Sequence, residues 1–73
     1  MMHRVFFDTN AGNPEDGYLL WFDKSRQDIE NIANDERDGA IIVLYMPGEI
    51  EMTARLMLDN SMNCWRGVPV ELR

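Results

Sequence analysis

Cysteine and histidine are almost absent from this chain of 73 residues, which has one of each, Cys64 and His3. A single cysteine cannot form an intramolecular disulfide. One cysteine and one histidine also cannot supply the N and S ligands of a tetrahedral zinc site. A lone thiol is typical of proteins in a reducing compartment. We therefore expect a cytoplasmic protein that is stabilised by neither disulfides nor zinc.

Long apolar runs are missing as well. No stretch approaches the roughly 20 apolar residues of a membrane span, and no apolar segment follows the N-terminus as it would in a secretory signal. The length leaves room for one domain, which we expect to span residues 1–73. A domain of this size buries only about 60% of the surface of its unfolded chain. Self-association is therefore the stabilising device that this composition leaves open.

Basic residues are scarce relative to acidic ones, at seven against thirteen, which gives a formal net charge of −6. A negative surface repels the phosphate backbone, so we expect no nucleic-acid partner. The acidic surface either serves solubility alone or forms a face that docks on a basic partner protein.

No motif for catalysis or ligand binding emerges from the chain. The loop at residues 8–17 is rich in oxygen-bearing side chains, but it lacks the glycine and glutamate spacing of an EF-hand. Cys64 has no general base near it unless the first and last strands are neighbours, as in a closed barrel, which would bring His3 close. The paired carboxylates lie at predicted turns, outside any cleft. We predict that the protein is not an enzyme and binds no metal or cofactor.

Alternation of apolar and polar residues predicts a sheet, most clearly at residues 50–58, where every second side chain is apolar. Pro47 and Gly48 predict a type II turn before this strand, because proline fixes φ at the second position and glycine permits a positive φ at the third. Pro69 places the last strand at an edge or introduces a bulge. The predicted strands are residues 4–8, 18–22, 40–46, 50–58 and 64–72.

One segment has helical spacing instead. Ile29 and Ile32 fall on one face of residues 25–34, with charged residues on the other face. Ser25 followed by Asp28 resembles a capping box at the start of this helix. A helix so short is not stable alone and must pack on the sheet.

These elements predict a mainly-β α+β fold in the order ββαβββ, with all strands antiparallel because hairpins join them. Two architectures fit: a five-stranded curled sheet, or a small barrel with the helix at one end. Trp65, Gly67 and Pro69 in the tail, after a long first loop, resemble small Src-homology-3-type (SH3-like) barrels. The resemblance covers only the topology and these few positions, and it implies no function. Strong curling is favoured because it hides strand edges.

Aromatic and methionine residues exceed what one small core can hold. If the apolar side of residues 50–58 faces the interior, Met57 faces outward, and we expect Trp65 beside it with Arg55 and Arg66 around them. Aromatic, methionine and arginine side chains are typical of interface centres. The alternative is that the helix covers this face and makes these residues part of the core.

The sequence therefore predicts a protein-interaction module that forms a homodimer through Arg55, Met57, Trp65 and Arg66. The alternative is an acidic regulator, such as an antitoxin, inhibitor or immunity-type protein, that docks on a basic protein.

Overall fold

The computed structural model describes residues 2–71 and folds them into one mixed sheet, one α-helix and one short 3-10 helix. The mainly-β α+β class predicted from the sequence is confirmed, and the α-helix follows the third strand. In chain order, the elements are β1 (Arg4–Phe6), β2 (Gly12–Asn13), β3 (Gly17–Leu19), α1 (Asp23–Glu30), η1 (Asn34–Glu36), β4 (Ile41–Met46), β5 (Ile50–Asp59) and β6 (Cys64–Pro69).

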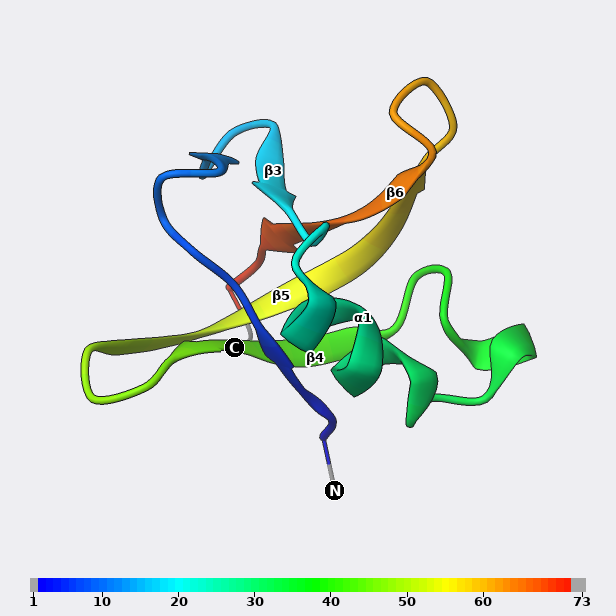
Figure 1. Ribbon diagram of the computed structural model, residues 1–73, viewed down its shortest axis with the longest axis horizontal. Helices are drawn as coiled ribbons and strands as arrows, with labels where there is room; N and C mark the ends of the chain where they lie inside the picture. Colours follow the sequence, from blue (N-terminus) through cyan, green and yellow to red (C-terminus); the bar gives the residue numbers. More distant parts are fainter. Residues whose placement is uncertain (1, 72–73) are drawn as a thin grey trace.

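The sheet has six strands in the order β1-β4-β5-β6-β3-β2 (Figure 1). The C-terminal meander, β4 to β6, is antiparallel as predicted. Two parts of the prediction are wrong: β1 pairs with β4 in parallel, and β2 forms a sixth strand within the loop 8–17. The chain leaves β1, forms the far edge of the sheet, and returns through α1 to run beside β1 in the same direction. Parallel pairing needs such a long crossover.

The sheet is open, so the predicted SH3-like barrel is also wrong. In this open sheet the ring of Phe7, just after β1, contacts the ring of Tyr18 in β3 with 5.0 Å between centroids. These two rings come from strands near opposite edges of the sheet. The last strand, β6, is not an edge strand but pairs with both β5 and β3. Pro69 is accommodated because it lies at the end of β6, beyond the part that pairs with β3.

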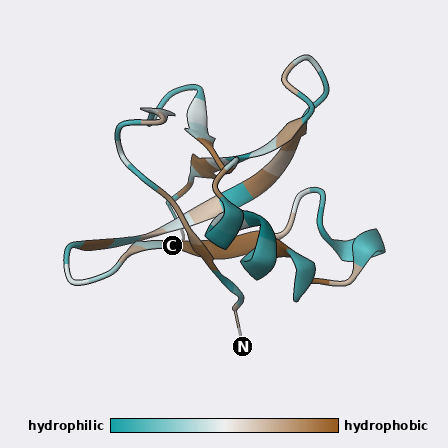
Figure 2. Ribbon diagram, in the orientation of Figure 1, coloured by the Kyte–Doolittle hydropathy of each residue, from teal (hydrophilic) through white to brown (hydrophobic). Residues whose placement is uncertain are grey.

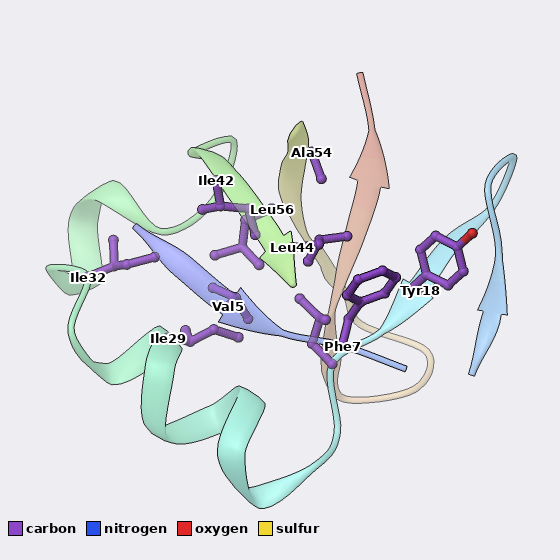
Figure 3. Close-up of a cluster of buried hydrophobic side chains, with 10 residues drawn as sticks. Val5, Phe7, Tyr18, Ile29, Ile32, Ile42, Leu44, Ala54 and Leu56 are labelled. Atoms are coloured by element: carbon purple, nitrogen blue, oxygen red, sulfur yellow. The ribbon is translucent and has the colours of Figure 1, made fainter. Parts of the chain in front are cut away.

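The core lies between α1 and the concave face of the sheet (Figure 3). Ile29 and Ile32 project from the helical segment toward Val5 in β1. The predicted alternation in β5 is confirmed, since Ala54 and Leu56 are fully buried on the core face. The buried apolar residues are Val5, Phe7, Tyr18, Leu20, Ile29, Ile32, Ile42, Leu44, Ala54 and Leu56.

Leu58 continues the same face of β5 but is 44% exposed, because the strand extends beyond the core. Ile50, at the other end, is 40% exposed for the same reason. The turn that begins β5 forms as predicted: Glu49 N–H donates to the Met46 carbonyl at 3.0 Å, and Gly48 has a φ of 74°.

Helix α1 is fixed to the edge of β1 by two of its own side chains. The Ser25 hydroxyl donates to the Phe6 carbonyl at 2.6 Å, and the Asp28 carboxylate accepts the Phe6 N–H at 3.0 Å. The predicted capping box is therefore wrong. The helix begins at Asp23, its N-cap has no side-chain hydrogen bond, and Ser25 and Asp28 lie within the helix. They satisfy the backbone groups that an edge strand would otherwise leave open.

Asp28 is the centre of this attachment, which we call the helix latch (Ser25, Asp28, Phe6 and Tyr45). Its carboxylate also accepts the Tyr45 hydroxyl at 2.9 Å and the Lys24 ammonium at 2.8 Å. Burial by itself would raise the pKa of Asp28. The hydrogen bonds from Lys24, Tyr45 and the Phe6 N–H outweigh burial, and the pKa is lowered. The carboxylate is therefore ionised in the neutral pH range.

Candidate interaction groove

A groove of about 420 Å³ opens between α1 and the end of the β5–β6 hairpin. Figure 1 shows this hairpin and the segment around η1 extending to the same side of the molecule. The base of the groove is apolar and includes Leu20, Ile29 and Trp65. The other lining residues are Trp21, Arg26, Glu30, Arg37, Leu58, Met62, Asn63 and Cys64.

The groove gathers exposed apolar side chains. Among residues 2–71, six large apolar side chains are classed as exposed, and three of them line this groove: Trp21 at 48%, Leu58 at 44% and Met62 at 46%. The other three are Met2, Ile50 and Met57. Isolated exposed apolar residues are normal on a protein surface, whereas a contiguous group of them marks an interaction site.

Trp21 is turned outward by the backbone that precedes it. Leu20 N–H donates to the Trp65 carbonyl at 2.8 Å, which ties the end of β3 to β6. Leu20 is thereby buried, with 1% of its surface exposed, and Trp21 projects to the outside of the core. Since Trp65 is the other tryptophan of the chain, both tryptophans line the groove.

The hairpin wall of the groove is held rigid by Asp59. One of its carboxylate oxygens accepts the Ser61 N–H, the Ser61 hydroxyl and the Met62 N–H, and the other accepts Arg66 Nε at 2.6 Å. The hydrogen bond from Ser61, followed by those from Arg66 and Met62, holds the pKa of Asp59 well below its usual range. The charges of Asp59 and Arg66 cancel, so this wall presents apolar side chains without net charge.

The helix wall of the groove carries charged side chains of both signs, namely Arg26, Glu30 and Arg37. Residues 23–38, which contain α1 and η1, have six acidic and three basic residues, a net charge of −3. Figure 2 shows hydrophilic residues along both helices. Arg26, on the groove, is paired with Asp23 at 2.8 Å, and Arg37 Nε donates to the Ile32 carbonyl. Glu30 lines the groove without an ion-pair partner.

The four residues predicted as one surface do not lie on one face. Met57 is the cross-strand neighbour of Arg66 and lies on the same side of the sheet as Arg55, away from the core. Trp65 is opposite Leu58 and lies on the core side, where it lines the groove. The structure therefore brings Arg55, Met57 and Arg66 together and separates Trp65 from them.

Trp21, Leu58 and Met62 were missed by the sequence prediction. The five consecutive apolar residues at 18–22 do not show which side of the strand is buried, and the structure shows that Tyr18 and Leu20 are buried whereas Trp21 is exposed. Leu58 projects from the same side of β5 as the buried Ala54 and Leu56. It is exposed because β5 extends beyond the end of the core. No local signal identified Met62.

The residues considered for chemistry do not assemble. β1 and β6 are separated in the sheet by β4 and β5, so the barrel contact that would have brought His3 toward Cys64 does not form. Burial, and then the negative charge of Asp59, raise the pKa of the Cys64 thiol. Within residues 2–71, no group of three or more His, Cys, Asp or Glu side chains is arranged to hold a metal ion.

A second hollow, of about 280 Å³, lies at the β4–β5 turn. The Arg4 guanidinium there pairs with Glu51 at 2.7 Å and lies 4.9 Å above the centroid of the Tyr45 ring. The hydrogen bond and charge of Arg4 lower the pKa of Glu51. Because these polar groups satisfy one another, the hollow offers less to a ligand than the apolar groove does.

No protein-family model matches this sequence, and comparisons with curated proteins and with solved structures found no match. In the part of the chain that the structure describes, no helix is long and apolar enough to cross a membrane.

Proposed function

We propose that this chain is a protein-interaction module that binds its partner through the groove between α1 and the β5–β6 hairpin. The observation that carries the proposal is the gathering of Trp21, Leu58 and Met62, each more than 40% exposed, around an apolar base. Aromatic and methionine residues are enriched at protein interfaces, and tryptophan is among the residues that supply most of the binding energy. The proposal requires no chemistry, and the free thiol of Cys64 is compatible with a cytoplasmic location.

Two partners fit this proposal. The first is a second copy of the chain, as the homodimer expected from the sequence requires. The second is a basic protein, as the alternative of an acidic regulator requires, and the formal net charge of −6 on the chain favours it. Arg55, Met57 and Arg66, on the opposite side of the sheet, are proposed as a separate and smaller contact surface.

Selection of binding peptides from a random displayed library tests whether the groove is an interaction surface. The purified protein serves as bait, and each selected peptide is then measured against the variants Trp21→Ser and Met62→Ser. Ile50→Ser is the matched control, because Ile50 is 40% exposed but lies at the end of β5 away from the groove.

We expect most selected peptides to bind the wild-type protein and Ile50→Ser equally and to bind both groove variants at least about tenfold more weakly. Circular dichroism checks that each variant is folded. If the selected peptides bind all variants alike, the groove is not the interaction surface and the proposal is wrong.

A further inference from the structure

We infer that two copies of this chain associate face to face through the outer side of the sheet, with their β5 strands antiparallel across the interface. The outer side is the side away from the core. In β4, β5 and β6 it presents Ile41, Val43, Thr53, Arg55, Met57, Arg66 and Val68. This surface is separate from the groove, so the inference goes beyond the proposed function and does not depend on it.

Strand β4 is apolar on both of its sides. Ile42 and Leu44 are fully buried in the core, whereas Ile41 and Val43 project from the outer side and are half-buried. A strand with water on one side commonly alternates apolar and polar residues, and a continuous apolar run is typical of a strand that is covered on both sides. The sequence of β4 is therefore that of a strand with a second covered face.

The chain itself provides a cover for one face only. Helix α1 packs on β1, where the helix latch fixes it, and the core lies between this helix and the inner side of the sheet (Figure 3). Among residues 2–71, neither α1 nor η1 packs on the outer sides of β5 and β6. Met57, on this side, is 40% exposed. A cover for the outer side must therefore come from another molecule.

The charge of the outer side allows two copies to meet there. Each chain has a formal net charge of −6, which opposes self-association through an acidic surface. The seven residues that define the outer side include two arginines and no acidic residue, and Arg66 is already paired with Asp59 at 2.6 Å. The outer side is therefore a surface at which two copies avoid this repulsion.

The charges along β5 are self-complementary. Glu51 and Arg55 lie on the outer side, two residues before and two residues after Thr53. A two-fold axis that crosses the strands at Thr53 lays the two β5 strands antiparallel, so that Glu51 of each copy lies opposite Arg55 of the other. An axis along β5 would instead bring like charges together, which disfavours that arrangement.

The same two-fold axis brings apolar residues together at the centre of the interface. Val43 is the cross-strand partner of Thr53 in β4, and Val70, just after β6, donates its N–H to the Thr53 carbonyl at 3.0 Å. Val43, Thr53 and Val70 thus form a row along the axis, and each meets its own counterpart. Stacked sheets bury such rows between them.

Association through a sheet edge fits less well. Strand addition needs an open edge, but the outer groups of Phe6 in β1 are already bonded to Ser25 and Asp28. The other edge strand, β2, has only two residues.

Sedimentation velocity at a series of protein concentrations tests the inference. We expect a monomer–dimer equilibrium with a dissociation constant in the micromolar range. Glu51→Arg and Arg55→Glu each place like charges opposite one another and should each weaken the dimer at least about tenfold. The double variant E51R/R55E makes the charges opposite again and should return the dissociation constant to within about threefold of the wild-type value.

Glu15→Arg is the matched control. It makes the same change as Glu51→Arg but lies in the exposed loop between β2 and β3, so it should leave the dimer unchanged. Circular dichroism checks that each variant is folded. Glu51→Arg also removes the pair with Arg4, but both side chains are more than half exposed, and such a pair contributes little to stability.

The outcomes separate this inference from the proposed function. A monomer at every concentration would overturn the inference, and so would a dimer that neither charge reversal weakens or that the double variant does not restore. A dimer that Met62→Ser dissociates would also overturn it, because the second copy would then bind in the groove, as the proposed function allows. The charge-reversal variants should still bind the displayed peptides, because Glu51 and Arg55 do not line the groove.

Discussion

Replacement of Asp28 by alanine should destabilise this protein far more than replacement of any other acidic residue on α1. Asp28 is only 7% exposed, and its carboxylate accepts three hydrogen bonds, from the Phe6 N–H, the Tyr45 hydroxyl and the Lys24 ammonium. Alanine removes all three acceptor contacts. Lys24 is exposed and can return to water, but the Phe6 N–H is left inside the junction between β1 and α1.

The magnitude follows from these contacts. An unsatisfied buried donor costs about 1–3 kcal/mol, and a hydrogen bond to a charged group contributes about 1.5–3 kcal/mol. The exposed Lys24 pair adds little. We therefore expect Asp28→Ala to lower the free energy of unfolding by about 3 kcal/mol, which is a large part of the roughly 5 kcal/mol typical of a small domain.

Asp28→Asn separates the hydrogen bonds from the charge. Its amide oxygen can still accept the Phe6 N–H and the Tyr45 hydroxyl, because one carboxylate oxygen accepts both of these bonds in the wild-type protein. Only the contact with Lys24 and the negative charge are lost. We expect a loss of about 1 kcal/mol for this variant. Glu30→Ala, on the same helix but without a partner, should change the stability by no more than about 0.5 kcal/mol.

Urea denaturation followed by circular dichroism measures all three variants. With a slope of roughly 1 kcal/mol per molar urea for a small domain, the midpoint should fall by about 3 M in Asp28→Ala and by about 1 M in Asp28→Asn. If Asp28→Ala shifts the midpoint no more than Glu30→Ala does, the helix latch does not hold α1 to β1 in solution, and the reasoning is refuted.

Three further predictions follow from single contacts. Because the folded-state pKa of Asp28 is lowered, its contribution is present above the ordinary aspartate value of about 4 and is lost as the pH falls; urea midpoints between about pH 5 and 2 should fall more steeply in the wild-type protein than in Asp28→Asn. Gly67→Ala places a Cβ 2.8 Å from two methyl carbons of the buried Leu44, which should cost about 1–3 kcal/mol in urea unfolding; a Leu44→Val background should reduce that loss, and additive effects would contradict the contact. Burial and the Asp59 carboxylate raise the pKa of the Cys64 thiol, so iodoacetamide should alkylate it several-fold more slowly in the folded protein than in urea, and equal rates would show an open thiol.

The C-terminal meander could be predicted from the sequence because its signals are local. Alternation along β5, the glycine of the β4–β5 turn and the polar β5–β6 turn each act within a few residues. The position of β1 could not be predicted in this way. Its neighbour β4 lies more than thirty residues further along the chain, and the three apolar residues from Val5 to Phe7 pair equally well in either direction. The two-residue β2 has no alternation to detect.

The sequence predicts the wrong side of the sheet for Trp65, for a more specific reason. Trp65 and Val68 project from opposite sides of β6, and a pattern in which the apolar Val68 marks the buried side puts Trp65 on the outer side. The core side of this strand is instead occupied by Gly67, against which the Leu44 side chain packs. A hydrophobicity pattern cannot show that a glycine is the core residue, because its contribution is the space that it leaves to a neighbour.

The exposed groove is a consequence of the helix latch. Helix α1 has eight residues and so extends about 12 Å, whereas the ten residues of β5 extend about 33 Å. Such a helix can cover only one part of the sheet, and Ser25 and Asp28 fix it at β1. The far end of β5, with Leu58, is therefore left without cover. A latch at the other end of the helix face would have buried Leu58 and exposed the edge of β1, so this fold protects a strand edge from unwanted pairing and leaves the apolar end of β5 exposed.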